Sequence, residues 1–426
     1  MPREAKGNSL AARVRRKLSY GWVVAIAGAG AAFAAANFQY TFGVFVKPLA
    51  NEFGWSRAAV SGSVSIRSAT SVLTAPLVGV LSDRYGPKKF ILAGILLVGL
   101  SYLLASRITS LWQLYLFLSV LIGIGVTNTL VPVVATVTRW FGHNSALANG
   151  IVMSGLSLAQ VILPPVATYL MIQYGWDTCF IILGLTAWVL GIVAWRFIKS
   201  PPPNMVKQTL ATPREGDTSE ISETPAEEPK DYMLSEALRT RTLWILLLVQ
   251  MVIALCYQMM VIHVIAAAND TGITLEAAAI ILTLSGITNT VGRLGMGGLA
   301  GKIGNQVVLA FCMALQAVAL FLLAGASTLY AFYLAATIFG LGYGGVSPIV
   351  VALAGSFFGT RAIGAIFGVA NITFNVGVAI GPFLAGYIFD TTGSYYIAFF
   401  SAAIATVITL LLCLLMKPPQ RKALAA

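Results

Sequence analysis

The chain has 426 residues, of which 58% are hydrophobic and only 10% are charged, and its mean hydropathy is +0.84. Soluble domains are about half apolar and a quarter charged, so this composition excludes a soluble globular protein and predicts an all-α polytopic membrane protein. The formal net charge is +12. Most basic residues lie in the segments expected on the cytoplasmic side of a membrane, so the charge indicates membrane orientation, and no nucleic-acid partner is expected.

Residues 1–19 form a basic arm that leads into the first apolar segment without the small-residue cleavage site of a secretory signal. Apolar runs long enough to cross a hydrocarbon core of about 30 Å then recur along the chain. We predict twelve transmembrane helices, at residues 20–46, 57–80, 88–106, 111–138, 145–172, 178–198, 242–267, 276–300, 305–325, 329–355, 361–389 and 394–416.

The segment 199–241 interrupts these apolar runs and is rich in Pro, Ser, Thr and Glu. Such a composition cannot bury a core, so we expect a mobile cytoplasmic linker. It separates a first six-helix bundle at 20–198 from a second at 242–416, which is followed by a cytoplasmic tail at 417–426.

The two halves repeat each other in sequence. Gly123 and Gly125 of LIGIG recur as Gly340 and Gly342 of IFGLG, and GVLSDRYG recurs as GGLAGKIG about 218 residues later. Landmarks that recur in the same order predict two pseudo-symmetric six-helix bundles related by an axis along the membrane normal.

The basic residues indicate the orientation. With the N-terminus inside, 22 of the 27 Lys and Arg residues lie on the cytoplasmic side of the twelve spans. This positive-inside bias predicts that both termini are cytoplasmic. We expect a multi-pass protein of the cell membrane, which in a bacterium is the inner membrane. A monomer is favoured over an oligomer.

Apart from charges at the ends of the predicted spans, such as Glu276, the two charges inside them are Arg293 and Arg67, and no Asp or Glu lies in the interior of a span. A guanidinium stays protonated and is costly within a bilayer, so an anionic ligand is expected to meet Arg293. Asn289 lies one helical turn before Arg293 and can orient a carboxylate that the guanidinium holds. Arg67 can bind a second carboxylate, line the exit path or bond helices together.

Two further residues have both a functional and an ordinary interpretation. Lys47, at the outer end of the first span, can concentrate anions at the mouth of a pathway or be a simple interfacial lysine. His263, near the outer end of the seventh span, can titrate and assist proton coupling or be an interfacial histidine bonded to a carbonyl. The four cysteines lie singly, and no metal, cofactor or nucleophile–base pair is predicted, so no enzyme is expected.

The loop GVLSDRYGPKK resembles the signature of the major facilitator superfamily between helices 2 and 3, with Asp83, Arg84 and Gly86 in place. The resemblance implies that Asp83 latches onto a neighbouring helix end in the outward-facing state. The copy in the second half is degenerate, because Gly301 stands where the Asp would be.

The segments FGVFVKPLANEFGWSRA, TRWFGHNSALANG and NTVGRLGMGG resemble the monocarboxylate and oxalate/formate transporter branch. The resemblance implies that Arg293 pairs with the substrate carboxylate and that Lys47 receives the anion first. It also implies that helices 7 and 11 line the cavity, which adds Tyr257 and Asn371 to the predicted site. Asn289 departs from the family, because animal members carry a proton-coupling acidic residue there, and helix 11 lacks the Lys of oxalate-type members.

We therefore predict a secondary active transporter that moves a small organic anion, a lactate- or pyruvate-like monocarboxylate, together with a proton by alternating access. Three alternatives remain open at this point. A carboxylate antiporter would use Arg67 and Arg293 together, and a carrier of a larger neutral or aromatic solute such as a vitamin would use the arginines for gating. A non-transporting sensor would keep the same fold.

Overall fold

The computed structural model describes residues 4–141, 145–201, 232–358 and 363–417. Within these ranges the chain is helical and contains no strand. The helices are α1 (Glu4–Ala35), α2 (Asn37–Phe53), α3 (Arg57–Tyr85), α4 (Pro87–Ala105), α5 (Leu111–Leu114), the π-helix η1 (Tyr115–Leu121), α6 (Ile122–Phe141), α7 (Ser145–Phe197), α9 (Leu234–Ala237), α10 (Arg241–Asp270), α11 (Leu275–Ile303), α12 (Asn305–Ala324), α13 (Leu329–Phe358), α14 (Ile363–Thr392) and α15 (Tyr396–Leu414).

The described ranges hold 11 helical segments long and apolar enough to cross a membrane. One of them, Leu147–Phe197, has 51 residues, about 77 Å of helix and more than twice the thickness of a hydrocarbon core. It breaks at Gly175, where φ is 82° and ψ is 164°, and the Cys179 Sγ lies 3.5 Å from the Ala167 carbonyl oxygen across the break. This segment folds back as a hairpin and supplies two crossings, which accounts for the twelve predicted spans.

The sequence repeat is also a structural repeat. Gly123 of α6 packs against α3, where an added Cβ would lie 3.0 Å from the Arg67 carbonyl oxygen. At the equivalent place in the second half, Gly340 of α13 packs against α11, and a Cβ there would overlap the Ser285 carbonyl oxygen. The same close helix contact therefore recurs in both halves, at the level of Arg67 in one and of Ser285 in the other.

Matching turns follow α3 and α11. Gly86 and Gly304 both have φ of 93°, a conformation that side chains other than glycine rarely adopt. Each glycine ends one helix and begins the next, so the short loop after the second helix of each half has the same geometry.

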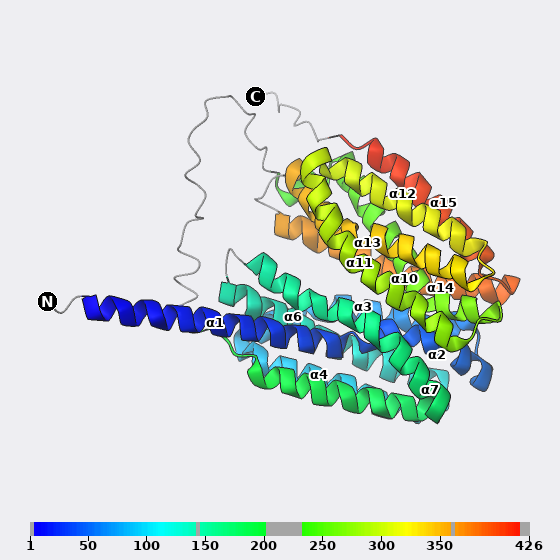
Figure 1. Cartoon of the computed structure of the whole chain (residues 1–426), viewed down its shortest axis with the longest axis horizontal. Coiled ribbons are helices and arrows are strands. Elements are labelled where there is room, and N and C mark those ends of the chain that lie inside the picture. The colour runs from blue at the N-terminus through cyan, green and yellow to red at the C-terminus, as the bar shows by residue number, and fades with distance from the viewer. Residues whose placement is uncertain (1–3, 142–144, 202–231, 359–362, 418–426) are drawn as a thin grey trace.

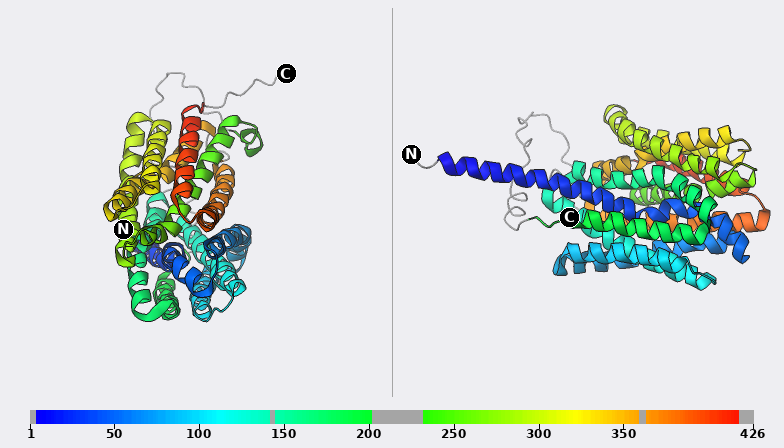
Figure 2. Two further views of the ribbon diagram at one scale, coloured as in Figure 1. Left: turned by 90° about the vertical axis from the view of Figure 1, so that its right-hand side faces the viewer. Right: turned by 60° about the horizontal axis from the view of Figure 1, so that its bottom comes forward.

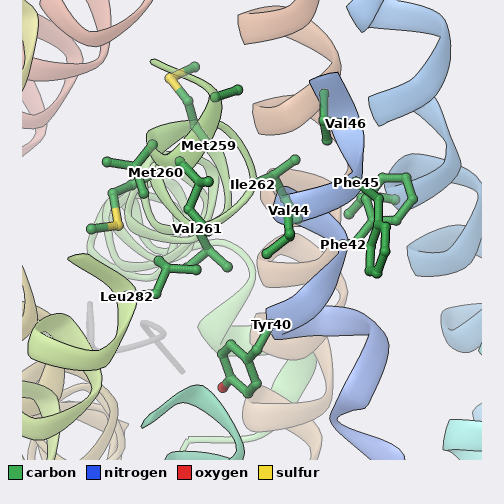
Figure 3. Close-up of a cluster of buried hydrophobic side chains, with 14 of the residues drawn as sticks. Tyr40, Phe42, Val44, Phe45, Val46, Met259, Met260, Val261, Ile262 and Leu282 are labelled. Atoms are coloured by element: carbon green, nitrogen blue, oxygen red, sulfur yellow. The ribbon is translucent and has the colours of Figure 1, made fainter. Parts of the chain in front are cut away.

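The N-terminal half lies below the C-terminal half in Figure 1, and the left panel of Figure 2 views the helices end-on as two groups. Most contacts between the halves are made by three pairs of helices, α3 with α14, α7 with α11 and α2 with α10. Gly43 of α2 permits the closest approach of the last pair, since a Cβ there would lie 2.8 Å from the Ile262 carbonyl oxygen. Buried side chains of α2, α10 and α11 surround this contact (Figure 3). The two halves are therefore tightly packed where α2 meets α10.

Two glycines of α13, one helical turn apart, pack directly on the backbone of α11, the helix that carries Arg293. Gly344 lies one turn after Gly340, and a Cβ on it would overlap the Asn289 carbonyl oxygen and lie 2.8 Å from the Arg293 amide nitrogen. Small residues four apart let two membrane helices pack backbone to backbone, so α13 fixes the backbone of α11 at the candidate site.

We predict that Gly344→Ala destabilises the protein, because the added methyl group collides with the backbone of α11; such overpacking costs about 1–3 kcal/mol. The matched control is Gly355→Ala on the same helix, where a Cβ meets nothing within 4 Å. Thermal unfolding in detergent should show a lower Tm for Gly344→Ala only. Equal Tm values for the two variants would contradict this packing.

Candidate functional site

Arg293 lies on α11, a helix whose other charges, Glu276 and Lys302, are near its two ends. The side chain is partly buried, and its Nε atom is buried without a hydrogen-bond partner. No carboxylate among the described residues forms an ion pair with it. The guanidinium is therefore an uncompensated positive charge inside the helical bundle.

The two turns that precede Arg293 also carry unpaired polar atoms. Asn289 and Ser285 are 3% and 1% exposed, and the Asn289 Oδ1 and the Ser285 Oγ have no hydrogen-bond partner. Residues four apart lie on one face of a helix, so α11 presents an amide, a hydroxyl and a guanidinium along one line. Buried polar groups normally find partners, and a ligand would supply them here.

Tyrosine side chains from three helices lie beside Arg293. Tyr257 of α10 stacks on Tyr343 of α13 with ring centroids 3.7 Å apart and nearly parallel planes. The Tyr257 hydroxyl donates to the Gln160 Oε1 of α7 at 3.3 Å, and the buried Tyr40 of α2 lies near Tyr257 and Arg293. Tyr257 thus lies where the sequence predicted, whereas Tyr40, Tyr343 and Gln160 were not among the predicted site residues.

Arg67 lies in a different part of the interface between the halves. It is 8% exposed, its Nε has no hydrogen-bond partner, and its guanidinium carbon is 5.6 Å from the centroid of the Phe38 ring. It lines a cavity of about 660 Å³ together with Gln258, Asn371 and Asn375. Of the predicted site residues, Asn371 therefore lies with Arg67 rather than with the group around Arg293.

The cavity begins where α3 and α14 stop touching. The Ser61 Oγ donates to the Pro382 carbonyl oxygen at 3.0 Å, and the Ser68 Oγ donates to the Asn375 carbonyl oxygen at 2.9 Å. Beyond Ser68 the two helices separate, and their next turns, including Pro76, form walls of the cavity. The halves are thus joined toward the start of α3 and apart toward its end.

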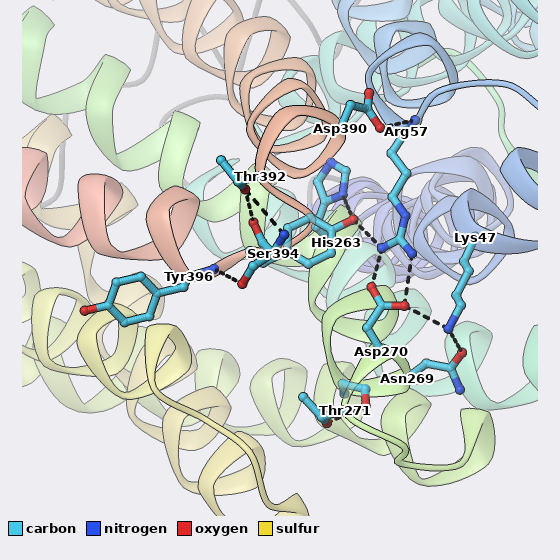
Figure 4. A network of polar contacts seen from close by, with 12 residues as sticks. Lys47, Arg57, His263, Asn269, Asp270, Thr271, Asp390, Thr392, Ser394 and Tyr396 are labelled. Carbon is cyan, nitrogen blue, oxygen red and sulfur yellow. Dashed lines mark hydrogen bonds and ion pairs between the residues drawn. The ribbon is translucent and has the colours of Figure 1, made fainter.

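Four charged residues close the joined end, and we call Lys47, Arg57, Asp270 and Asp390 the clasp (Figure 4). Asp270 of α10 accepts from both terminal nitrogens of Arg57, at 2.5 and 3.0 Å, and pairs with the Lys47 Nζ at 2.8 Å. The Asp390 carboxylate accepts from the backbone amides of Arg57 and Ala58 at 2.9 and 2.8 Å, where the dipole of α3 favours a negative charge. Each ion pair of the clasp links one half to the other.

His263 is fully buried behind the clasp; it is bonded to a carbonyl, as one of its two interpretations expected, but it does not lie at the interface. The difference arises because α10 continues to Asp270, about two turns further. The Nε2 lies 2.8 Å from the Pro382 carbonyl oxygen, and the Nδ1 lies 3.0 Å from the Tyr395 hydroxyl, which accepts from Arg57 at 2.9 Å. The carbonyl only accepts, so the Nε2 carries a hydrogen. The Tyr395 hydroxyl, which accepts from Arg57, can donate its own hydrogen to the Nδ1, and this arrangement suits a neutral His263.

Tyr395 lies in the loop between α14 and α15 and links His263 to the clasp. Burial raises the pKa of its hydroxyl above the ordinary value, so the hydroxyl keeps its hydrogen and can donate it to the Nδ1 of His263. No local pattern predicts this link, because Tyr395 is far from both partners along the chain.

Lys47 is not a free surface cation in this structure. Its side chain is 26% exposed, and it bonds the Asn269 Oδ1 at 2.7 Å in addition to Asp270. A role in receiving an anion requires the clasp to open first, so that role stays a prediction.

The signature loop lies at the opposite end of the bundle. The Asp83 Oδ1 is 2.5 Å from an Arg139 terminal nitrogen, and both side chains are exposed. The Arg84 guanidinium lies over the Tyr85 ring, and Gly86 forms the turn. Asp83 contacts its own half here, and its predicted latching onto a neighbouring helix end in the outward-facing state stays a prediction.

The fold and this arrangement of charges can be compared with known proteins. The sequence profile of the Major Facilitator Superfamily matches residues 27–267 and 246–426, one match for each half. The chain belongs to this superfamily. Its members carry solutes across membranes as two six-helix bundles, which agrees with the fold described for this chain.

Relatives narrow the branch to the monocarboxylate transporters. Monocarboxylate transporter 13 of Rattus norvegicus is 27% identical over 385 residues, 89% of this chain and 85% of that protein. Monocarboxylate transporter 2 of Homo sapiens is 27% identical over 403 residues, 91% of this chain and 83% of that protein. These relatives are transporters rather than enzymes.

A solved structure supports the fold alone. The crystal structure of a bacterial homologue of the human lysosomal transporter Spinster, in an inward-facing and occupied conformation, is similar with a TM-score of 0.68 and 14% sequence identity. The match covers 93% of this chain and 95% of that one.

We predict that Asp270→Asn loosens the joined end, because it removes the charge that holds both Arg57 and Lys47. The test is the labelling rate of a single cysteine at Ile262, buried in the contact between α2 and α10, by a water-soluble maleimide, with the four native cysteines replaced. We expect labelling several-fold faster than in the parent.

The matched control is Asp83→Asn, which also removes an acid that pairs with an arginine but at the other end of the bundle. It should leave the labelling rate at Ile262 unchanged. A rate that rises equally in both variants, or in neither, would contradict the role of the clasp.

Proposed function

We propose that this transporter carries small organic anions by alternating access and binds the substrate carboxylate at Arg293. The observation that supports this most directly is the partly buried guanidinium without a carboxylate partner among the described residues. A carboxylate can accept two parallel hydrogen bonds from it and cancel its charge. Asn289 and the hydroxyls of Tyr40 and Tyr257 would then bond the remaining polar atoms of the substrate.

The substrate class follows from the site and from the relatives. The Arg293 group offers a single cation, a neutral amide and aromatic rings, which suit a small carboxylate with one hydroxyl or keto group. The relatives are named monocarboxylate transporters. We propose a lactate- or pyruvate-like monocarboxylate as the substrate.

The membrane orientation is part of the same proposal. With both termini in the cytoplasm, as the positive-inside bias favours, the clasp faces the outside and the Arg67 cavity opens toward the cytoplasm. Substrate would enter past Lys47 when the clasp is open and leave through the cavity when it is closed. We place this cycle in the bacterial inner membrane, with a monomer as the transporting unit.

Proton coupling must use different groups than in animal relatives, because Asn289 cannot bind a proton as their acidic residue does. We propose that a proton travels either on the substrate carboxylate bound at Arg293 or on His263. A second proton on His263 would add a cation beside Arg57 and remove the acceptor for the Tyr395 hydroxyl, so protonation would weaken the clasp. Carboxylate antiport is the second candidate, favoured by the absence of a carboxylate beside Arg293 in the described ranges.

We predict that Arg293→Gln abolishes carboxylate uptake into proteoliposomes. The loss of charge-assisted hydrogen bonds to an ion costs about 1.5–3 kcal/mol, or roughly 10- to 100-fold in affinity. Arg293→Lys should recover little of it, because an ammonium cannot form the two-pronged contact. Lys302→Gln, an exposed cation on the same helix, serves as the control and should transport normally. Undiminished uptake by Arg293→Gln would disprove the proposed site.

We predict that His263→Gln reduces the stimulation of uptake by external acid while uptake at alkaline pH stays near that of wild type. Glutamine can keep both hydrogen bonds of the neutral histidine but cannot take up a proton. The measurement is lactate uptake into proteoliposomes as a function of external pH. His143→Gln changes the other histidine of the chain and should keep the wild-type profile. An unaltered profile in His263→Gln would exclude this residue from proton coupling.

A further inference from the structure

The proposed function leaves Arg67 without a role. This guanidinium is more than nine-tenths buried, its Nε has no hydrogen-bond partner, and none of the described ion pairs includes it. Its neighbour Phe38 offers only the face of an aromatic ring. A structural arginine inside a membrane protein normally bonds carbonyl or carboxylate oxygens, and this one bonds neither within the described ranges.

Arg67 points into a site of suitable size and chemistry. The cavity of about 660 Å³ falls in the range of pockets that hold small molecules. Its lining includes the amide side chains of Gln39, Gln258 and Asn371. The Gln258 Nε2 is buried without a partner, so a second unsatisfied donor lies in the same cavity as the arginine.

The position of Arg67 relative to Arg293 follows from the repeat. The place of Arg67 on α3 corresponds to Ser285 on α11, because Gly123 and Gly340 pack against these two residues in the same way. Arg293 lies eight residues beyond Ser285, about 12 Å further along its helix. The two cations therefore belong to opposite halves and lie at different depths.

Monocarboxylates and dicarboxylates differ in how many of the two arginine charges they can neutralise. When the halves close around a ligand and exclude water, every uncompensated charge inside becomes more costly. A monocarboxylate at Arg293 leaves Arg67 unpaired, whereas a ligand with two carboxylates neutralises both. Building on the proposed function, we propose that Arg67 is a second carboxylate subsite and that the transporter also takes short dicarboxylates, with one carboxylate at each arginine.

The test uses the full-length protein in proteoliposomes at neutral pH. The competitors of labelled lactate uptake are malonate, succinate, glutarate and adipate, whose carboxylates are separated by increasing distances, and the monomethyl ester of each. The ester keeps the size and removes one charge. In wild type we expect one chain length to be optimal and to inhibit at least about tenfold more strongly than its ester.

Arg67→Gln should remove this preference and leave inhibition by the monomethyl esters unchanged, while Arg67→Lys should keep part of it. Lys302→Gln removes a surface cation and should behave as wild type. Calorimetric titration of each purified variant with the best dicarboxylate gives a readout that does not require transport, and wild type should bind one molecule per chain. Loss of affinity with an unchanged Tm separates a binding defect from misfolding.

The result that overturns the second subsite is a wild-type preference for the dicarboxylate that persists in Arg67→Gln, or no preference in wild type. Binding of two dicarboxylates per chain would also overturn it. These outcomes leave the proposed function intact if Arg293→Gln still abolishes lactate uptake. Conversely, a preference that depends on Arg67 while Arg293→Gln transports lactate normally would support the subsite and reject the proposed function.

Discussion

A guanidinium held inside an apolar bundle without a counter-charge is the interaction on which the remaining features of this site depend. Arg293 stays protonated at any physiological pH, so the protein must either hydrate it or meet it with an anion. The surroundings suit the anion that we propose as its partner: an amide lies one turn away, tyrosine hydroxyls come from neighbouring helices, and no described carboxylate pairs with it. Glycines of α13 hold the backbone of α11 at this level, so the charge has a fixed position.

The two ends of the molecule are built from different chemistry, and this difference supports alternating access. The clasp joins the halves through charged groups that water can also solvate, while the adjoining contact between α2 and α10 is apolar and tight. At the other end the signature loop bonds within its own half, and α3 and α14 separate around a cavity. In the proposed cycle, opening the clasp would exchange ion pairs for hydration, a small free-energy difference that substrate binding or a proton would offset.

The parts of this structure that repeat or that follow helical periodicity could be predicted from the sequence. The span count, the recurrence of the loop after α3 as the loop after α11, and the isolated arginines were all predicted from patterns in the sequence. The clasp could not be predicted, because Arg57 and Asp270 are 213 positions apart and each resembles an ordinary charge at a helix end. The burial of His263 depended on how far α10 extends, and the separation of Asn371 from Arg293 depended on how the halves pack. In the proposed cycle the contacts between the two halves would differ from state to state. A single sequence pattern therefore does not predict which residues meet in a given state.

A structure with bound substrate tests the central claim most directly. We predict that a carboxylate such as lactate, resolved in the purified protein by cryo-electron microscopy, places both carboxylate oxygens within about 3 Å of the Arg293 guanidinium. Asn289 and the Tyr257 hydroxyl should lie within reach of its remaining oxygen. A carboxylate found elsewhere, with Arg293 bonded to protein carbonyl oxygens in the same map, would contradict the account.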